Sequence, residues 1–447
     1  MIEKIAENFL YHIWDEQHLK QNLNTVNKQK VKILFQGKWN TAAGPDFRSA
    51  ILIIGNEKIQ GDVEIHKIEN DWQHHKHHED KNYNDVILHV VFRNDIDKKF
   101  TISEDGTKIP ILILQDNLDP QVNKLWKKYG GISFDTRQIE TIPCRLSDKL
   151  KTEKELLKTL SYFGKTRFKR KAKRFSAELY NSDFNQIIYK GIMEALGYSK
   201  NKIPFLKLAS DFSYKKLQSF SKILNSPTEL FCLLVIKSGI DLPKYNYKFI
   251  NDEIVDLYKK MKYKLGYDLT NGMSSSYNWN FFRLRPTNHP LYRMWQISPF
   301  LYSILNKNLA NKIFSIFSVS QKKSIKYNQF KQNFYNLINK SDKKRQKVGR
   351  SRCDDIFVNI ILPVGYIYAE TLDYGKLESI IKNTYFNLSK LSENHITKYI
   401  RSRLKNNIKN SRKIKLIHQQ GMIQLYYRFC NHHDCENCLH NILENVS

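Results

Sequence analysis

The stretch "FRSAILIIGNEKIQGDVEIHKI", residues 47–68, decides how the first part of the chain folds. Two runs rich in Ile and Val flank Gly-Asn at 55–56, a dipeptide that accepts positive φ and therefore predicts a β-hairpin. Side chains alternate between the faces of a strand, so Asp62, Glu64 and His66 share one face of the second strand. The hairpin thus gathers polar side chains on a face that a sheet would normally bury.

An aspartate precedes the first strand of this hairpin, in "AAGPDF" at 42–47. For a loop of two to four residues, the pairing places Asp46 opposite one of residues 65–67. In the middle register Asp46 faces His66 directly and Glu64 diagonally, on the same side of the sheet. Neighbouring carboxylates raise each other's pKa, so a divalent cation is the expected partner of this group.

The pattern around the hairpin predicts an α+β fold. A helix is expected over residues 4–20, and the chain beyond about residue 146 has long helical segments with few strand candidates. We predict one domain over 1–145 and a mostly α-helical domain over 146–447. The predicted strands occupy residues 31–36, 47–54, 59–67, 86–92 and 108–114.

The composition argues against a membrane protein and for a cytoplasmic one. Hydrophobic residues make up 41% of the 447 residues, as in ordinary globular proteins, and the longest apolar runs fall far short of the ~18 residues that cross a bilayer. The first residues place acids and a histidine among apolar side chains, which is typical of an amphipathic helix and not of a signal peptide.

Positive charge is concentrated in the second domain. Residues 1–150 hold 21 basic and 22 acidic side chains, whereas residues 151–447 hold 52 and 22. AT-rich codon usage would enrich lysine in both parts alike, so the asymmetry favours a polyanionic partner, which we expect to be nucleic acid. The candidate contacts, in "GKTRFKRKAKRF" (164–175) and "FFRLRPTNHPLYR" (281–293), are Lys165, Arg167, Lys169, Arg170, Lys171, Arg283, Arg285 and Arg293. The alternatives are a solvated helix face for the first run and ion pairs between helices for the second.

A histidine-rich tract, "DWQHHKHHED" at 71–80, follows the second strand of the hairpin. Such tracts can bind zinc or another transition metal, but their imidazoles can equally cap helix ends or contact phosphate. We expect the tract to line the same cleft as Glu64, and keep a separate zinc site as the alternative. The predicted cleft-lining residues are Asp62, Asp71, His75, His77, His78, Asp80 and His89.

Pro45-Asp46 followed by Glu64-Ile65-His66 resembles the signature of the PD-(D/E)XK nuclease superfamily, and the order of predicted elements is similar to its αβββαβ core. The resemblance implies that Asp46 and Glu64 hold Mg²⁺ or Mn²⁺ and that Glu7 of the first helix is a further acid. His66 stands where lysine is usual, and its imidazole could accept a proton from the attacking water or position it.

Three cysteines crowd the end of the chain, in the arrangement Cys430-x4-Cys435-x2-Cys438. Thiols at this density suit tetrahedral Zn²⁺ or an iron–sulfur cluster, and the fourth ligand could be His440, His433 or Cys144. Some PD-(D/E)XK exonucleases clamp their core with one distant cysteine and three C-terminal ones, and this layout is similar in outline.

A second resemblance spans nearly the whole chain. The segments "GKWNTAAGPDF", "GDVEIHKIENDWQHHKHHEDKNYNDVILHVV", "FFRLRPTNHPLYRMWQ", "VNIILPVGYIYA" and "QGMIQLYYRFCNHHDCENC" resemble an uncharacterised bacterial family, catalogued as a domain of unknown function. This resemblance implies the domain layout and no activity.

The function predicted from the PD-(D/E)XK resemblance is a metal-dependent nuclease acting on DNA or RNA. The alternatives are a non-catalytic nucleic-acid-binding or scaffold protein on an inactivated nuclease fold, and a zinc hydrolase centred on the histidine tract.

Overall fold

The chain divides into two compact units, each built from segments that are distant in sequence. The computed structural model describes residues 7–40, 43–95, 98–119, 144, 150, 152–198, 200–270, 277–318, 327–339, 347–404, 413–432, 435 and 438. Unit 1 comprises Met1–Phe163, His395–Lys409 and Gly421–Ser447, and unit 2 comprises Gly164–Asn394 and Asn410–Gln420. The last two segments of unit 1 fall within the range that the sequence assigned to the helical domain.

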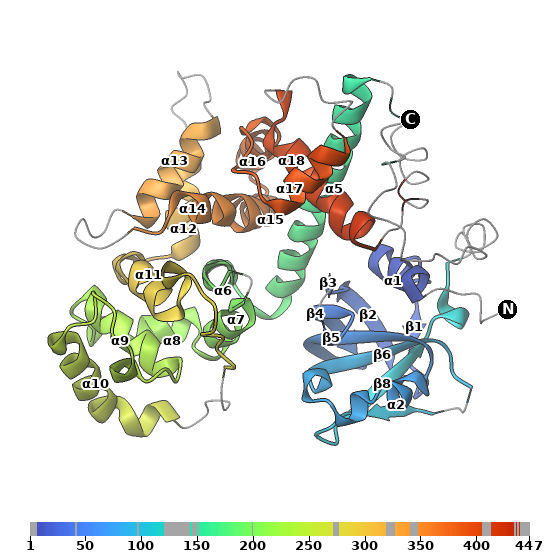
Figure 1. The fold of residues 1–447 in the computed structure, drawn as a ribbon, viewed down its shortest axis with the longest axis horizontal. Helices are drawn as coiled ribbons and strands as arrows, with labels where there is room; N and C mark the ends of the chain where they lie inside the picture. Colours follow the sequence, from blue (N-terminus) through green and yellow to red (C-terminus); the bar gives the residue numbers. More distant parts are fainter. Residues whose placement is uncertain are drawn as a thin grey trace. The chain divides into compact units, whose positions relative to one another are not determined.

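Unit 1 is built around a curled mixed sheet with strand order β1-β2-β4-β5-β6-β8-β7 (Figure 1). β2, β4 and β5 form an antiparallel meander, β6 is parallel to β5, β8 is parallel to β6, and β3 pairs with β4. The strands are β1 (Leu23–Asn24), β2 (Lys30–Phe35), β3 (Lys38–Trp39), β4 (Phe47–Ile54), β5 (Glu57–Ile68), β6 (Val86–Arg93), β7 (Phe100–Ile102) and β8 (Lys108–Ile113).

The loop of the β4–β5 hairpin has two residues, within the predicted range of two to four, but the register further along differs from the prediction. Ile54 pairs with Glu57, so the pairing near the loop is as expected, whereas Phe47 pairs with Val63 after a β-bulge in β4. The bulge moves the start of β4 by one residue relative to β5. Asp46 therefore meets Glu64, and the predicted position opposite residues 65–67 is wrong.

One face of the sheet carries the core of unit 1, and helix α1 (Glu7–Glu16) contributes to it. Val63 and Ile65 of β5 are fully buried in one cluster with Leu10, Ile13 and Trp14, as the alternation of β5 predicted. The segment between β5 and β6 holds only short helices: α2 (Asp71–His74), η2 (His77–Glu79) and η3 (Lys81–Tyr83). The remaining elements of unit 1 are η4 (Gln115–Asn117), α17 (His395–Arg403) and η14 (Cys430–His432).

Unit 2 is helical and has one large core in which aromatic side chains such as Tyr189, Phe231 and Phe300 are buried. Helices α5 (Glu153–Glu178) and α18 (Leu416–Arg428) contribute residues to both units. None of the helices that the structure describes has the length and apolar character needed to cross a bilayer. The other elements are η6 (Leu179–Asn181), α6 (Phe184–Leu196), α7 (Lys202–Asp211), α8 (Tyr214–Ser219), η7 (Phe220–Lys222), α9 (Pro227–Lys237), η8 (Leu242–Lys244), α10 (Asp252–Thr270), η9 (Pro286–Asn288), α11 (Pro290–Ile304), α12 (Leu309–Phe314), η10 (Ser315–Phe317), α13 (Tyr327–Ile338), α14 (Arg350–Ile356), the π-helix η11 (Phe357–Ile361), α15 (Leu362–Thr371) and α16 (Gly375–Asn387).

Candidate functional site: a carboxylate pair beside a histidine cluster

Asp46 and Glu64 form an interlocked pair where β4 begins beside β5. The backbone N–H of Asp46 donates to Oε2 of Glu64 at 2.9 Å, and the backbone N–H of Ile65 donates to Oδ2 of Asp46 at 3.0 Å. Tyr11 of α1 donates its hydroxyl to the Asp46 carboxylate. Each carboxylate is thus held in one orientation by the backbone that carries the other.

Burial makes negative charge costly at this pair. It raises the pKa of Asp46 well above its usual value, and the nearby charge of Glu64 adds to this effect. Burial also raises the pKa of Glu64 to about 8, against the hydrogen bond from the Asp46 N–H, which lowers it. At neutral pH the pair is therefore expected to be fully ionised only when a cation compensates its charge.

Glu7, in the first turn of α1, lies within electrostatic range of this pair. Burial raises the pKa of Glu7, and the charges of Lys67 and His75 partly offset that effect. The charge of Glu7 in turn raises the pKa of both Asp46 and Glu64. The structure therefore brings together the three acids that the sequence singled out.

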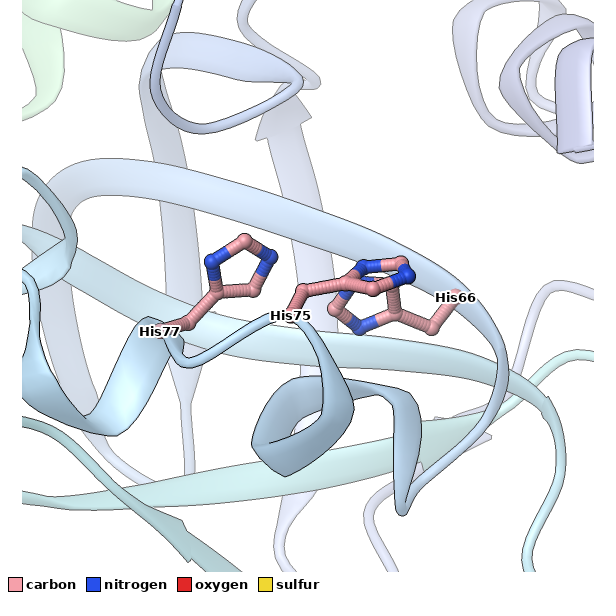
Figure 2. Close-up of side chains that lie close together, drawn as sticks. All are labelled: His66, His75 and His77. Atoms are coloured by element: carbon pink, nitrogen blue, oxygen red, sulfur yellow. The ribbon is translucent and has the colours of Figure 1, made fainter.

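Three histidines, His66, His75 and His77, lie close together (Figure 2). His66 comes from β5, His75 follows the end of α2, and His77 begins η2. Each offers one ring nitrogen, and these three atoms all lie within 4.8 Å of one another. Oε1 of Glu64 lies 3.5 Å from Nε2 of His66 and 3.3 Å from Nε2 of His77.

The conformation of the chain between β5 and β6 brings the His77 side chain to Glu64. Lys76 adopts the left-handed conformation, with φ 60°, between α2 and η2. Trp72 anchors α2 by donating its indole N–H to the carbonyl of Ile102 at 3.0 Å. The His77 ring stacks on Tyr83, with ring centroids 3.8 Å apart. These contacts fix the imidazole against the sheet.

A buried chain of hydrogen bonds begins at Nδ1 of His66. Nδ1 of His66 lies 2.9 Å from Nε2 of His89, and Nδ1 of His89 lies 2.7 Å from the Thr101 hydroxyl. Burial lowers the pKa of His89 to about 3 and that of His66 well below its usual value. Both imidazoles are therefore neutral at physiological pH.

The other predicted cleft residues have structural contacts. Asp62 accepts from Arg48 at 2.8 Å and from the backbone N–H of Ser49 at 2.9 Å, so its charge is already compensated. Asp71 accepts from the backbone N–H of Ile68, and Asp80 caps η3 by accepting from the Asn82 N–H. His78 lies 3.4 Å from Glu79.

The basic candidates in unit 2 differ in their surroundings. On α5, Lys165 and Lys169 are exposed, whereas Arg167, Arg170 and Lys171 are half-buried. Arg167 donates to Gln420, and Lys171 donates to Asn359.

In the second basic segment, Arg283 and Arg285 are accessible, and the Arg283 guanidinium lies over the Phe282 ring. Arg293 is 3% exposed and donates to Gln296, Tyr198 and Asn288 at 2.6–2.8 Å. These contacts are typical of a structural arginine and leave its guanidinium poorly placed to meet a phosphate.

Within unit 1, Cys144 and Cys435 lie within electrostatic range of Cys430. Burial raises the pKa of the Cys430 thiol to about 12, and the neighbouring Cys144 and Cys435 contribute to this rise. Cys438 is buried, and none of the four forms a disulfide. His433 and His440, the alternative ligands, lie outside the described residues.

Sequence reasoning missed Tyr11, Arg48 and Thr101. Tyr11 lies one helical turn after Glu7, and that i, i+4 spacing would have placed both on one face of α1. Arg48 and Thr101 carry no such signal, because their partners depend on a β-bulge and on the pairing of β7 with β8.

Comparison with known proteins identifies a family. The model of a family described as "Protein of unknown function (DUF2851)" matches residues 7–395. No curated protein and no solved structure matches the chain at a significant level. The matched range includes every residue of the carboxylate pair and of the histidine cluster. Because it also covers most of the chain, the protein belongs to the DUF2851 family of proteins of unknown function.

Proposed function

We propose that the protein hydrolyses phosphodiester bonds in DNA or RNA with the help of a divalent metal ion, Mg²⁺ or Mn²⁺. The observation that carries this proposal is the buried pair of Asp46 and Glu64, interlocked through their backbone N–H groups. Buried carboxylates with raised pKa values are frequent at catalytic sites. Oxygen donors of this kind fit Mg²⁺ and Mn²⁺.

The residues of the site have distinct roles in this proposal. Asp46 and Glu64 would hold the metal, which supplies a polarised phosphate and a bound water of lowered pKa. Tyr11 orients the Asp46 carboxylate through its hydroxyl. Glu7 adds negative charge that favours a bound cation. His66, a neutral imidazole, can accept a proton from water near Glu64.

The strand arrangement also supports the proposal. An antiparallel meander of β2, β4 and β5 followed by parallel β6 is compatible with the αβββαβ core of PD-(D/E)XK nucleases. The excess positive charge of residues 151–447 suits a polyanionic substrate. Lys165, Lys169, Arg283 and Arg285 are the accessible cations that we expect to contact phosphates.

We further propose a structural Zn²⁺ or iron–sulfur cluster held by Cys144, Cys430, Cys435 and Cys438. Its support is the proximity of Cys144 and Cys435 to Cys430, although 286 positions separate Cys144 from Cys430 in the sequence. Four thiols are the usual ligand set for both groups. Such a group would join distant segments of unit 1.

The nuclease proposal is tested by hydrolysis of labelled single- and double-stranded DNA and RNA with Mg²⁺ or Mn²⁺. Asp46→Asn and Glu64→Gln are expected to lower the rate by roughly 100-fold or more, because changes even outside the ligand shell of a metal commonly cost 10–100-fold. Asp116→Asn, which alters an exposed acid in η4, is the matched control. Hydrolysis that survives both site variants would refute the proposal, and binding without hydrolysis would indicate an inactivated nuclease fold.

A further inference from the structure

The histidine cluster contains more than the nuclease proposal uses. One ring nitrogen from each of His66, His75 and His77 lies within 4.8 Å of the others, and Oε1 of Glu64 lies beside Nε2 of His66 and Nε2 of His77. They come from β5, from the end of α2 and from the start of η2 (Figure 2). Three imidazoles and one carboxylate are a donor set that suits Zn²⁺ and neighbouring transition metals better than Mg²⁺.

We propose that Glu64, His66, His75 and His77 form a four-ligand site for a transition-metal ion of the Zn²⁺ type. Ligand atoms about 2.0–2.2 Å from a tetrahedral ion lie roughly 3.3–3.5 Å apart. The structure gives 3.2 Å between His66 and His75, 3.5 Å between His66 and Glu64, and 3.3 Å between His77 and Glu64. These are three of the six edges of a tetrahedron, and they agree with one bound ion.

An alternative is a purely hydrogen-bonded cluster, which the contacts of His77 disfavour. Nε2 of His77 is buried and makes no hydrogen bond to any residue that the structure describes, although Oε1 of Glu64 is 3.3 Å away. Charge-assisted N–H···O bonds are typically about 2.7–2.9 Å long. A buried nitrogen without a hydrogen bond is costly, whereas the same nitrogen is satisfied as a metal ligand.

The surrounding shell is also that of a metal site. Metal-binding histidines usually donate their second ring N–H to an outer partner, which fixes the tautomer. His66 can donate from Nδ1 to His89, and His89 can donate from Nδ1 to the Thr101 hydroxyl. In that arrangement Nε2 of His66 presents its lone pair to the cluster.

Glu64 is shared between this site and the carboxylate pair, through different oxygens. Its Oε2 accepts from the Asp46 N–H, while its Oε1 faces His66 and His77. Metal binding at this site depends on its four ligands and does not require nuclease activity. If both sites are filled, His66 is a ligand and cannot serve as the base. His75 is exposed, so the ion would be accessible from solvent.

The test is metal stoichiometry of the full chain, which needs no nucleic acid. Chelator-treated protein is loaded with Zn²⁺, and bound metal is measured by elemental analysis for the wild type, the double variant His75→Ala/His77→Ala and His74→Ala. His74 is an exposed histidine of α2 that contacts Asn70 and Asp71, so it is the matched control. All three proteins keep the cysteines, so any thiolate-bound metal cancels in the comparison.

We expect the double variant to bind one Zn²⁺ fewer than the wild type and His74→Ala to bind the same number. Co²⁺ should give visible absorption of a nitrogen- and oxygen-ligated site that disappears in the double variant. The single change His75→Ala, at an exposed position, should preserve the fold and weaken Zn²⁺ binding at least 10-fold. Equal stoichiometry in the wild type and the double variant, together with unchanged affinity in His75→Ala, would overturn the proposal.

Discussion

Ser49 determines where the side chain of Asp46 lies. It has a φ of 57°, in the left-handed region that residues other than glycine seldom adopt. Arg48 and Ser49 form the bulge of β4, and Asp62 fastens it by accepting from the Arg48 guanidinium and the Ser49 N–H. Asp62, which the sequence suggested as a cleft-lining residue, therefore stabilises the backbone that positions Asp46.

A substitution at Ser49 should separate backbone conformation from chemistry. Ser49→Gly is expected to leave the stability of unit 1 within about 0.5 kcal/mol and to preserve the proposed hydrolysis, because glycine accepts positive φ. Ser49→Val should cost about 1–3 kcal/mol, since a β-branched residue resists that conformation. Denaturant unfolding and hydrolysis rates measure the two effects. Equal stability of the two variants would show that the bulge does not constrain Asp46.

At the scale of elements, two helix starts depend on neutral histidines. Nδ1 of His289 accepts from the Leu291 N–H at the start of α11, and Nδ1 of His418 accepts from the Lys415 N–H at the start of α18. Burial lowers the pKa of each to about 4, and the charge of Lys415 contributes at His418. Protonation of either ring would remove the acceptor.

These histidines predict that unit 2 loses stability in mild acid. The unfolded chain takes up protons at these residues near pH 6.5, whereas the folded chain takes them up only near pH 4, so the free energy of unfolding falls between those values. Denaturant midpoints at pH 7 and pH 5 measure the loss. His289→Gln and His418→Gln should each reduce this pH dependence, and His395→Gln, at an exposed position, should not. If all three variants lost the same stability between pH 7 and pH 5, the assignment of this pH dependence to His289 and His418 would be wrong.

The sequence predicted the regular elements of unit 1 better than its irregular ones. The predicted strands at 31–36, 47–54, 59–67, 86–92 and 108–114 are all present, because alternation and β-branched residues specify them. The face of β5 that holds Glu64 and His66 was also predicted. The register of Asp46 was not, because Ser49 gives no glycine signal for a bulge. β1, β3 and β7 are too short to show a periodicity.

The histidine cluster shows the same limit. The tract at 71–80 was predicted to line the same cleft as Glu64, with a separate zinc site as the alternative, but no shared group of His66, His75 and His77 was predicted. Their convergence depends on the left-handed Lys76 and on the stacking of His77 on Tyr83, which no local pattern reveals. The domain boundary at 145/146 and the nucleic-acid contacts stay predictions.

At the scale of the molecule, the cysteines test whether distant parts of unit 1 are joined by a metal. Cys438→Ser should abolish metal bound through thiols and lower the melting temperature of the protein, because structural metal binding is coupled to folding. Protein purified without oxygen would be brown with an iron–sulfur cluster, or colourless with zinc. Cys232→Ser, at a buried cysteine of unit 2, should leave that metal content unchanged. Absence of both metals from the wild type would refute the clamp.

The charge of the chain predicts nucleic-acid binding with a steep salt dependence. If six to ten phosphates are contacted, affinity should fall by roughly 10³–10⁵ between ~50 and ~200 mM salt, because each contact releases counterions. Replacing the exposed Lys165 and Lys169 with alanine should reduce the slope of log K against log salt by about 1–2. The exposed Lys259 and Lys260 of α10 provide the comparison. Affinity that does not change with salt would show that the net charge of +29 is only a matter of composition.

The construction of unit 1 has a consequence for how the protein is made. Its first segment ends at Phe163, and its later segments begin at His395 and Gly421, so all of unit 2 that precedes Asn394 is translated between them. At about 5–20 residues per second, the nascent carboxylate pair waits on the order of tens of seconds for the chain that completes its unit. A chain whose synthesis stops within unit 2 therefore lacks two of the three segments of unit 1, and only translation through Gly421–Ser447 supplies the last of them.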